Sequence, residues 1–205
     1  NLEQVTRQQS YWASSEGDEY ISRNISGSLH SANLNFFSQI FSSMGEVPKS
    51  ILELGANVGM NYRAISSLSS STEFTGLEVN NKAVEELGSL GCETIHSSIE
   101  DFQPSQTYDL VFTKGVLIHL NPDSLASTYK KMVDATHKWL LVAEYYSPKP
   151  ETIEYRGKKD LLFKRDFAGE ILDGFSEMKL HSYGFSYHRG AFPQDDISWF
   201  VLTKA

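Results

Sequence analysis

The stretch 51-ILELGANVGMN-61 decides the fold, because an apolar run breaks there into two glycines. Gly55 and Gly59 directly follow a predicted strand, and a residue without a side chain lets the backbone approach a ligand closely. Glu78 stands nineteen residues beyond Gly59, at the end of the next predicted strand. A carboxylate at that place can accept hydrogen bonds from both ribose hydroxyls, so the spacing indicates an adenosine ligand. The alternative is that the glycines only shape a tight connection and that Glu78 is a solvated acid.

The pattern that follows this stretch predicts an α/β protein. Short β-rich runs, separated by helical segments, occupy 50–56, 73–79, 92–97, 108–113 and 139–145. This alternation is typical of a parallel sheet with helices on both faces. The last two runs, 179–187 and 197–204, leave no room for a helix between them and should pair as an antiparallel hairpin. We therefore expect a seven-stranded, mostly parallel sheet that ends in an antiparallel C-terminal hairpin.

The segment before residue 48 has helical patterning alone. In 28-SLHSANLNFFSQIFSSMG-45 the apolar residues recur at helical intervals, and the pattern stops at Gly45. We expect residues 1–47 to form an N-terminal helical cover and residues 48–205 to form the ligand-binding domain. Together they should make one compact domain.

Two further helices are expected in the second half of the chain. The segment 121–137 opens with Asn at a cap position and Pro at the first helical position, which is a good helix start. A loop with Pro148 and Pro150 follows the fifth β-rich run, and a short helix should then cover 166–175.

Composition excludes several classes of protein. The net charge of -8 leaves no broad basic surface, which argues against a nucleic-acid partner. The single Cys92 excludes a disulfide framework and a cysteine-based zinc site. No apolar run approaches the ~20 residues that span a bilayer, and the polar start is not a signal peptide. We expect a soluble, cytoplasmic protein without a membrane partner.

The residues of the glycine turn favour one adenosine ligand over another. A dinucleotide fingerprint read from Gly55 would need glycine at positions 57 and 60, but Asn57 and Met60 stand there. The other option is S-adenosylmethionine (SAM), which has an amino-acid end in place of a pyrophosphate. Glu53 lies two residues before Gly55 on the same strand face, close to where that end would lie. A carboxylate inside a strand is costly unless a cation or backbone donors meet it.

Several blocks of the sequence resemble one enzyme family. The stretch E-L-G-A-N-x-G at 53–59 resembles motif I of class I SAM-dependent methyltransferases. Longer blocks resemble the methylases associated with pseudaminic acid biosynthesis, namely 17-GDEYISRN-24, 113-TKGVLIHLNPD-123, 144-EYYSPKP-150, 155-YRGKKDLLFKRDFAGE-170 and 194-QDDISWF-200. The resemblance extends from about Trp12 to Trp199 and implies the Rossmann-like class I methyltransferase fold.

The resemblance also implies a cofactor and a class of acceptor. By position, SAM would be held by Glu53, Gly55, Asn57, Gly59 and Glu78, with Ser98 and Ile99 near the adenine. We add four neighbouring strand-end residues to the expected cofactor set, namely Asn61, Val79, Thr113 and Lys114. The family implies a small polar acceptor such as an amino sugar, a sugar acid, or an amine or guanidino compound. Whether nitrogen or oxygen receives the methyl group stays open.

Catalytic candidates should come from the carboxyl ends of the strands. A methyl group on a sulfonium is attacked in line, so catalysis mainly requires positioning of the acceptor. An amine acceptor needs only to be unprotonated, whereas a hydroxyl benefits from a general base. His119 follows the fourth strand, and Glu144, Tyr145 and Tyr146 end the fifth. Tyrosine faces can also surround a developing positive charge. For His119 the alternative is a structural role in capping or packing.

Acceptor-binding candidates lie outside the sheet. The segment 155–166 is rich in Arg and Lys and could grip a carboxylate or phosphate, although a solvated loop is the alternative. Tyr11, Trp12, Tyr20 and Asn24 could form a lid over bound ligands, or the aromatic rings among them could pack onto the sheet. His188, Asp195 and Asp196 could line the acceptor site or form a polar turn. The predicted substrate-binding set is Trp12, Tyr20, Asn24, Tyr155, Arg156, Lys164, Arg165 and His188.

Three alternatives are weighed against a methyltransferase. Tyr155 and Lys159 fit the Y-x-x-x-K spacing of nicotinamide-dependent short-chain dehydrogenases, but Gly157 between them makes the required helix doubtful. A metal-dependent enzyme would need oxygen ligands after the fourth strand, where Thr113 and Lys114 stand, so no metal is expected. A SAM-binding scaffold subunit without an acceptor site is a non-enzymatic alternative.

Overall fold

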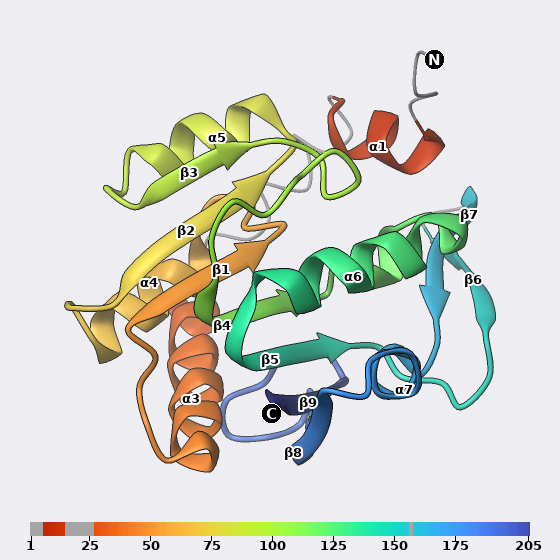
Figure 1. Ribbon diagram of the computed structural model, residues 1–205. Coiled ribbons are helices and arrows are strands. Elements are labelled where there is room, and N and C mark those ends of the chain that lie inside the picture. The colour runs from red at the N-terminus through yellow and green to blue at the C-terminus, as the bar shows by residue number, and fades with distance from the viewer. Residues whose placement is uncertain (1–5, 15–26, 156–157) are drawn as a thin grey trace.

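The centre of the computed structural model is a seven-stranded sheet (Figure 1). The structure describes residues 6–14, 27–155 and 158–205. The strands of this sheet are Ser50–Leu54 (β1), Glu73–Glu78 (β2), Glu93–His96 (β3), Tyr108–Lys114 (β4), Thr136–Glu144 (β5), Met178–Ser186 (β8) and Ile197–Lys204 (β9). Their order is β3-β2-β1-β4-β5-β9-β8. Strands β1 to β5 pair in parallel and β9 is antiparallel to both β5 and β8, which confirms the predicted sheet.

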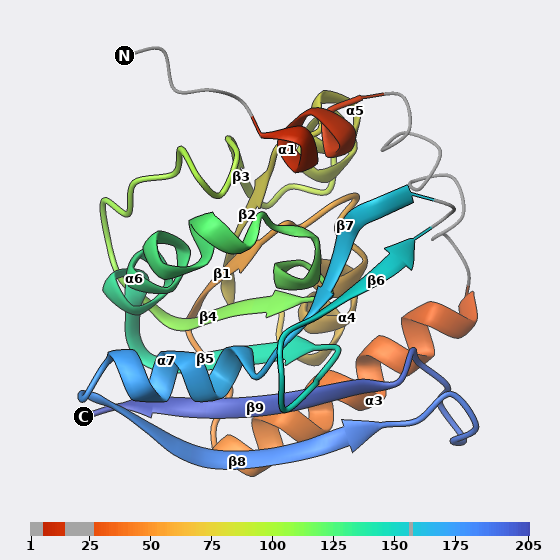
Figure 2. The ribbon, with the colours of Figure 1, turned by 90° about the vertical axis from the view of Figure 1, so that its right-hand side faces the viewer.

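Helices cover both faces of the sheet (Figure 2). They are Arg7–Trp12 (α1), Gly27–Met44 (α3), Met60–Leu68 (α4), Asn81–Gly88 (α5), Leu125–Ala135 (α6) and Phe167–Gly174 (α7), with short 3₁₀ turns at Leu117–His119 (η1) and Pro122–Ser124 (η2). Helices α3 and α4 share a core cluster with one face of the sheet, and α6 and α7 share another cluster with the opposite face. None of the described helices is long and apolar enough to cross a membrane.

The apolar run that opens β1 is explained by burial on both faces. Ile51 packs in the cluster of α3 and α4, whereas Leu52 and Leu54 pack in the cluster of α6 and α7. All three side chains are almost completely buried. A strand in the middle of a parallel sheet has no solvent face, so its sequence is apolar without alternation.

A second, two-stranded sheet stands where the sequence predicted a loop. Strands β6 (Glu151–Tyr155) and β7 (Lys158–Lys164) pair antiparallel, with Ile153 opposite Leu162. Leu161, Leu162 and Phe163 are buried, so a short apolar run inside a charged segment holds the hairpin against the molecule. The prediction of a loop here was wrong, because the surrounding charges hid this run.

Candidate functional site

The turn after β1 has a backbone that requires glycine. Gly55 and Gly59 have φ angles of 75° and 78°, in the left-handed region that glycine adopts without strain. A Cβ on Gly55 would lie 2.7 Å from Cγ2 of Val116, and a Cβ on Gly59 would lie 2.6 Å from Cδ1 of Leu90. The turn is thus packed tightly on two sides and has no room for a larger residue.

Glu78 ends β2 beside this turn and is held by backbone donors. Its Oε2 accepts a hydrogen bond of 2.8 Å from the N–H of Asn57, and its Oε1 accepts bonds of 2.8 Å from the N–H groups of Val79 and Asn80. Burial raises the pKa of Glu78, while these three bonds act to lower it. The carboxylate therefore has a fixed orientation and keeps acceptor capacity for a ligand.

Glu53 is a buried acid with one unsatisfied oxygen. Its side chain is 1% exposed, and its Oε1 accepts a 2.6 Å hydrogen bond from Nδ2 of Asn61. Its Oε2 has no hydrogen-bond partner among the described residues. Burial raises the pKa of Glu53 to about 8, opposed by the Asn61 bond and by the charge of Lys114. An oxygen left unsatisfied at such a cost indicates that a ligand donor or cation belongs there.

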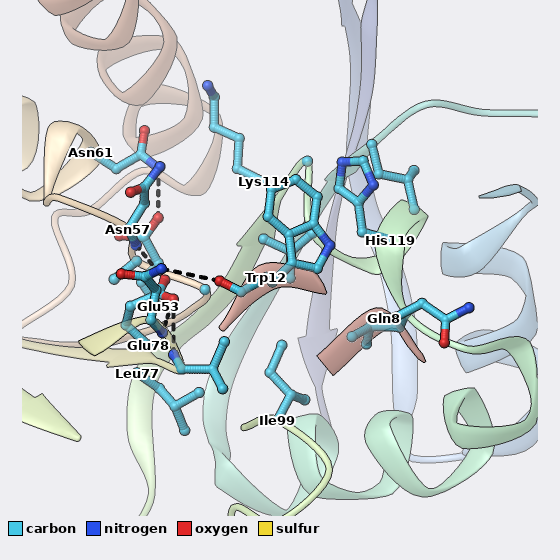
Figure 3. A pocket seen from close by; sticks show the side chains of 18 of the residues that line it. Gln8, Trp12, Glu53, Asn57, Asn61, Leu77, Glu78, Ile99, Lys114 and His119 are labelled. Atoms are coloured by element: carbon cyan, nitrogen blue, oxygen red, sulfur yellow. Dashed lines mark hydrogen bonds between the residues drawn. The ribbon is translucent and has the colours of Figure 1, made fainter. Parts of the chain in front are cut away.

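A cavity of about 490 Å³ opens at the carboxyl ends of β1, β2 and β4 (Figure 3). This volume suits a small molecule, and its position agrees with the rule that ligands of open parallel sheets bind beyond the strand ends. The predicted residues that line it are Trp12, Glu53, Gly55, Asn57, Asn61, Glu78, Val79, Ser98, Ile99, Lys114, His119 and Tyr145. Twelve predictions from six separate parts of the chain therefore meet in one place.

The loop that carries Ser98 and Ile99 is held from two sides. Oγ of Ser98 donates a 2.6 Å hydrogen bond to Asp101 and accepts one of 3.1 Å from Nε2 of Gln9 on α1. On the other side, Nζ of Lys131 on α6 donates to the carbonyls of Ile99 and Glu100. These contacts fix the wall of the cavity where the sequence predicted the adenine.

His119 lies between the hairpin and α1. Its Nδ1 is 2.8 Å from the carbonyl oxygen of Leu161 on β7, and its ring lies 4.6 Å from that of Trp12. Because a carbonyl oxygen can only accept, Nδ1 carries a hydrogen, so that in the neutral form of the ring the lone pair is on Nε2. Trp12 is itself held by a 3.2 Å bond from Nδ2 of Asn80 to its carbonyl. The ring thus makes the packing contacts weighed for His119 and also lines the cavity.

Lys114 is held by Asn33, which is in turn bonded to Gln194; neither buried amide was among the predicted site residues. Oδ1 of Asn33 on α3 accepts hydrogen bonds from Nζ of Lys114 at 3.3 Å and from Nε2 of Gln194 at 3.1 Å. Asn33 is 1% exposed. Its position in the apolar stripe of the helix predicted over 28–45 was the available signal, because a buried amide needs partners.

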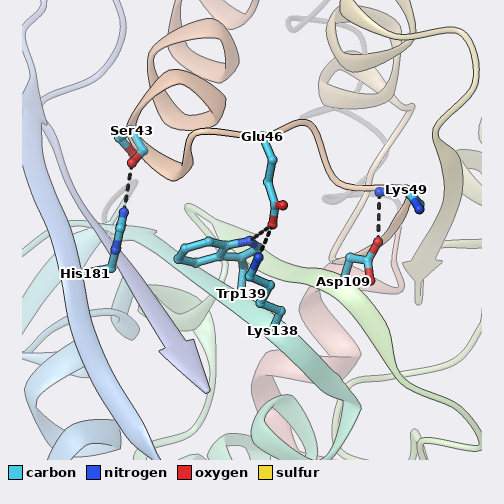
Figure 4. A network of polar contacts seen from close by, with 7 residues as sticks. All are labelled: Ser43, Glu46, Lys49, Asp109, Lys138, Trp139 and His181. Atoms are coloured by element: carbon cyan, nitrogen blue, oxygen red, sulfur yellow. Dashed lines mark hydrogen bonds and ion pairs between the residues drawn. The ribbon is translucent and has the colours of Figure 1, made fainter. Parts of the chain in front are cut away.

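The far end of α3 is anchored by a separate polar network (Figure 4). Oε1 of Glu46 accepts hydrogen bonds of 2.7 Å from Nζ of Lys138 and of 2.6 Å from Nε1 of Trp139. Nε2 of His181 lies 2.8 Å from the carbonyl oxygen of Ser43. This network lies at the amino end of β5, so α3 is fixed at one end there and reaches the cavity with the other.

Glu144 does not line the cavity, contrary to the catalytic prediction. It is 2% exposed, and its carboxylate accepts hydrogen bonds from the N–H groups of Val116, Leu117 and Ile118. Burial raises its pKa to about 7, although these bonds lower it. Glu144 thus holds the turn that leads into η1, because its side chain points to the backbone after β4 rather than to the cavity.

Tyr145 lines the cavity, whereas its neighbour Tyr146 does not. The hydroxyl of Tyr145 donates a 3.1 Å hydrogen bond to Oδ2 of Asp195, which also lines the cavity. Nζ of Lys164 lies 5.5 Å from the centroid of the Tyr145 ring. Tyr146, which follows the end of β5 and forms an isolated bridge with Arg165, is 44% exposed and packs near Phe200.

Several other predicted residues lie apart from the cavity. Arg165 forms a 2.7 Å ion pair with Glu170, and His188 pairs with Asp196 at 2.9 Å on the surface. Thr113 is completely buried on the face opposite Lys114. Residues absent from the cavity lining are Gly59, Thr113, Glu144, Tyr146, Lys164, Arg165 and His188. Tyr20, Asn24, Arg156 and the side chain of Tyr155 lie outside the described part of the chain.

The described residues contain no cluster of three or more His, Cys, Asp or Glu side chains placed to hold a metal ion. Of the acids at the cavity, Glu53 accepts from one side-chain amide and Glu78 accepts from three backbone N–H groups. The chemistry of the site is therefore built from carboxylates, one lysine, one imidazole and aromatic rings.

The fold is that of the Rossmann-like class I SAM-dependent methyltransferases among the solved structures. No family model and no curated protein sequence matches the chain. Magnesium protoporphyrin IX methyltransferase (ChlM) from Synechocystis PCC 6803 with bound SAM has a TM-score of 0.73 and 13% identity, covering 100% of both chains. The DhpI–SAM–HEP complex has a TM-score of 0.69 and 14% identity, again over 100% of both. The 1,6-didemethyltoxoflavin-N1-methyltransferase from Burkholderia thailandensis has a TM-score of 0.72 and 12% identity, covering 96% of this chain and 87% of that chain.

Proposed function

We propose that this protein is a SAM-dependent methyltransferase that transfers a methyl group to nitrogen or oxygen of a small polar metabolite. One observation carries the proposal: within one cavity, Glu78 is fixed by three backbone N–H groups, and Glu53 has a buried oxygen to which no described residue donates. An adenosine ribose and an amino-acid ammonium are the groups that two such carboxylates suit. The fold neighbours solved with SAM or S-adenosylhomocysteine support this reading.

The residues of the cavity fit SAM in three parts. Glu78 would accept the ribose hydroxyls, and the loop of Ser98 and Ile99 would hold the adenine. Gly55 has no Cβ, so the backbone of the turn can approach the ligand. Glu53 would meet the ammonium group. When bound, SAM supplies an electrophilic methyl group. The protein supplies the binding, the orientation and the exclusion of water.

His119 and Tyr145 are the residues that we propose to contact the acceptor. Both line the cavity next to Val116 and Gly115, at the ends of β4 and β5. Nε2 of His119 carries the lone pair and can remove a proton from a hydroxyl or an ammonium acceptor. Tyr145 is oriented by its bond to Asp195. A basic nitrogen and an aromatic ring at one cavity wall suit transfer to a polar acceptor.

The acceptor itself is proposed from the sequence resemblance. The fold neighbours carry names of very different acceptors, a magnesium porphyrin, a glycopeptide and 1,6-didemethyltoxoflavin, so they do not select one. The resemblance to methylases associated with pseudaminic acid biosynthesis favours an amino sugar, a sugar acid or a related amine. The single cysteine fits a reducing compartment, so we also propose a cytoplasmic location.

We further propose that residues 1–47 act as a cover over a methyltransferase domain of residues 48–205. The contacts of α1 support this division: Gln9 donates to Ser98, and the ring of Trp12 lies against His119. All four of these residues line the cavity. A segment in this place can close over bound ligands and exclude water.

Two alternatives remain to be separated from this proposal. The dehydrogenase alternative requires Tyr155 and Lys159 on one helix, but they belong to different strands, β6 and β7. A non-catalytic SAM-binding scaffold would share Glu53 and Glu78 with an enzyme. Against it, folding alone does not require the His119 and Tyr145 side chains at the cavity wall.

Isothermal calorimetry with SAM and with NADH tests the proposal. Binding of SAM without a signal for NADH is the expected result. Turnover is then tested by incubating the protein with SAM and amine or sugar acceptors and measuring S-adenosylhomocysteine. Absence of SAM binding would refute the proposed function, and SAM binding without turnover of any acceptor would favour the scaffold.

A further inference from the structure

The charges that line the cavity are strongly unequal. Four acids line it, namely Glu53, Glu78, Glu100 and Asp195. Among the described lining residues, Lys114 is the one lysine or arginine. Burial lowers the pKa of its ammonium group to about 8, and the nearby charges of Glu53, Asp195 and Glu144 oppose this shift. A cation kept at such a cost inside a ligand cavity indicates a negative partner in the ligand.

We propose that Lys114, positioned by Asn33, holds the carboxylate of the amino-acid end of SAM, so that Glu53 and Lys114 together recognise a zwitterion. The inference rests on the proposed function and deepens it, because it gives the amino-acid end of the ligand two opposite charges. It also explains why the chain keeps an acid and a lysine within electrostatic reach of each other in one cavity.

The first support is the geometry of the two charged groups. Oε2 of Glu53 is buried and has no hydrogen-bond partner in the part of the chain that the structure describes, which leaves a place for an ammonium group. Lys114 reaches the same cavity from the end of β4, and β4 is the direct neighbour of β1 in the sheet. In Figure 3 the side chain of Lys114 runs upward between the labelled Asn61 and Trp12, and its ammonium nitrogen points toward α3, where Asn33 accepts its hydrogen bond. An α-amino acid has its ammonium and carboxylate on one carbon, so both fit between adjacent strands.

The second support is the buried network that orients Lys114. Oδ1 of Asn33 accepts from both Lys114 and Gln194, and both amide side chains are buried. Placing two amides in a core is costly unless they serve a polar contact. With one lone pair of Asn33 used by each donor, the ammonium of Lys114 is fixed and keeps further hydrogens for a ligand. Asn33 is therefore a positioning residue.

The test compares three ligands with the wild-type protein and Lys114→Met. SAM, decarboxylated SAM and 5′-methylthioadenosine are titrated by calorimetry; the second lacks the carboxylate, and the third lacks the whole amino-acid end. We expect Lys114→Met to lower the affinity for SAM by about 10- to 100-fold, which corresponds to the loss of one charged hydrogen bond. The affinities of Lys114→Met for decarboxylated SAM and 5′-methylthioadenosine should stay within about twofold of those of the wild-type protein. Neither ligand has the carboxylate that Lys114 is proposed to hold.

Two further variants complete the design. Asn33→Leu should lower the affinity for SAM but not for the other two ligands, by a smaller factor than Lys114→Met does. Lys82 is an exposed lysine on α5, and Lys82→Met should bind all three ligands as the wild-type protein does. Equal weakening of all three ligands by Lys114→Met, or unchanged SAM affinity, would overturn the inference. In the latter case a raised KM for an acceptor would assign Lys114 to the acceptor. If the wild-type protein binds none of the three, the proposed function itself fails.

Discussion

Glu78 and Glu53 illustrate, at the scale of single residues, how the same side chain acquires different chemistry from its surroundings. Three backbone N–H groups surround the carboxylate of Glu78, whereas Glu53 has one amide partner and an unsatisfied oxygen. Glu78 is thus prepared to accept from neutral hydroxyls. Oε2 of Glu53 has no donor among the described residues, so this carboxylate gains most from a cation.

Glu78→Ala should weaken SAM binding by about 1 to 3 kcal/mol, because a charged hydrogen-bond acceptor for the ribose is lost. Calorimetry measures the change. Glu73→Ala is the matched control, since Glu73 begins the same strand and is exposed. Unchanged affinity of Glu78→Ala for SAM would exclude the ribose assignment.

His119→Asn should lower kcat on the order of 100-fold or more while SAM affinity stays nearly constant, if the acceptor loses a proton to Nε2. The asparagine amide can still donate to the carbonyl of Leu161, so the packing role is preserved. Rates with an identified acceptor are measured across pH 6 to 9. His188→Asn, on the surface, should match wild type. A kcat of His119→Asn equal to that of wild type would leave His119 with packing alone.

At the scale of elements, the turn between β4 and η1 depends on a side chain from β5. The cavity is lined by Gly115 and Val116 of this turn and by Ile118 and His119 of η1. The carboxylate of Glu144 on β5 accepts hydrogen bonds from the backbone N–H groups of Val116 and Leu117. The sequence placed Glu144 at the right strand end, but could not tell that its carboxylate faces backbone donors instead of a ligand.

Glu144→Gln should therefore lower the free energy of unfolding by about 1 to 3 kcal/mol, because an amide NH₂ replaces one of the acceptor oxygens. SAM affinity and kcat should fall together as the turn shifts. Denaturant unfolding and calorimetry measure the two effects, and Glu177→Gln on the surface serves as the control. A fall in kcat alone, with unchanged stability and SAM affinity, would contradict this structural role and support a catalytic one for Glu144.

At the scale of the whole molecule, buried acids make stability depend on pH. Burial raises the pKa of Glu53 to about 8 and that of Glu144 to about 7, from an ordinary value of 4.5. The folded protein keeps protons there that the unfolded chain releases. Their contribution to stability is thus complete below about pH 4.5 and is lost as the pH rises through about 7 to 8.

Glu53→Gln removes one of these titrations. Between about pH 5 and pH 8, the free energy of unfolding of the ligand-free variant should fall less than that of wild type, by on the order of 1 kcal/mol or more. Denaturant unfolding at several pH values measures it. The range ends at pH 8 because the pKa of Lys114 is lowered to about 8. Above that pH the titration of Lys114 raises the free energy of unfolding, which opposes the effect of Glu53. Parallel pH profiles of the two proteins would contradict the raised pKa of Glu53.

The sheet was predictable because its strands are buried on both faces and separated by clear helical patterns, as Ile51 and Leu52 show. The glycine turn was also predictable from local sequence, because Gly55 and Gly59 directly follow an apolar run. The β6–β7 hairpin and the partners of Lys114 were not, because they depend on contacts between distant segments. Asn33 and Gln194 are 161 positions apart, and no local pattern relates them.

The hydrogen bond from His119 to the Leu161 carbonyl has a consequence for mutagenesis and for sequence drift. Every residue type carries the same carbonyl, so position 161 can change its side chain while the imidazole keeps its tautomer. An alanine scan would pass over this contact, and so would a comparison of homologous sequences. Exchange of the amide between residues 161 and 162 for an ester, which makes the carbonyl oxygen a weaker acceptor, would reveal it.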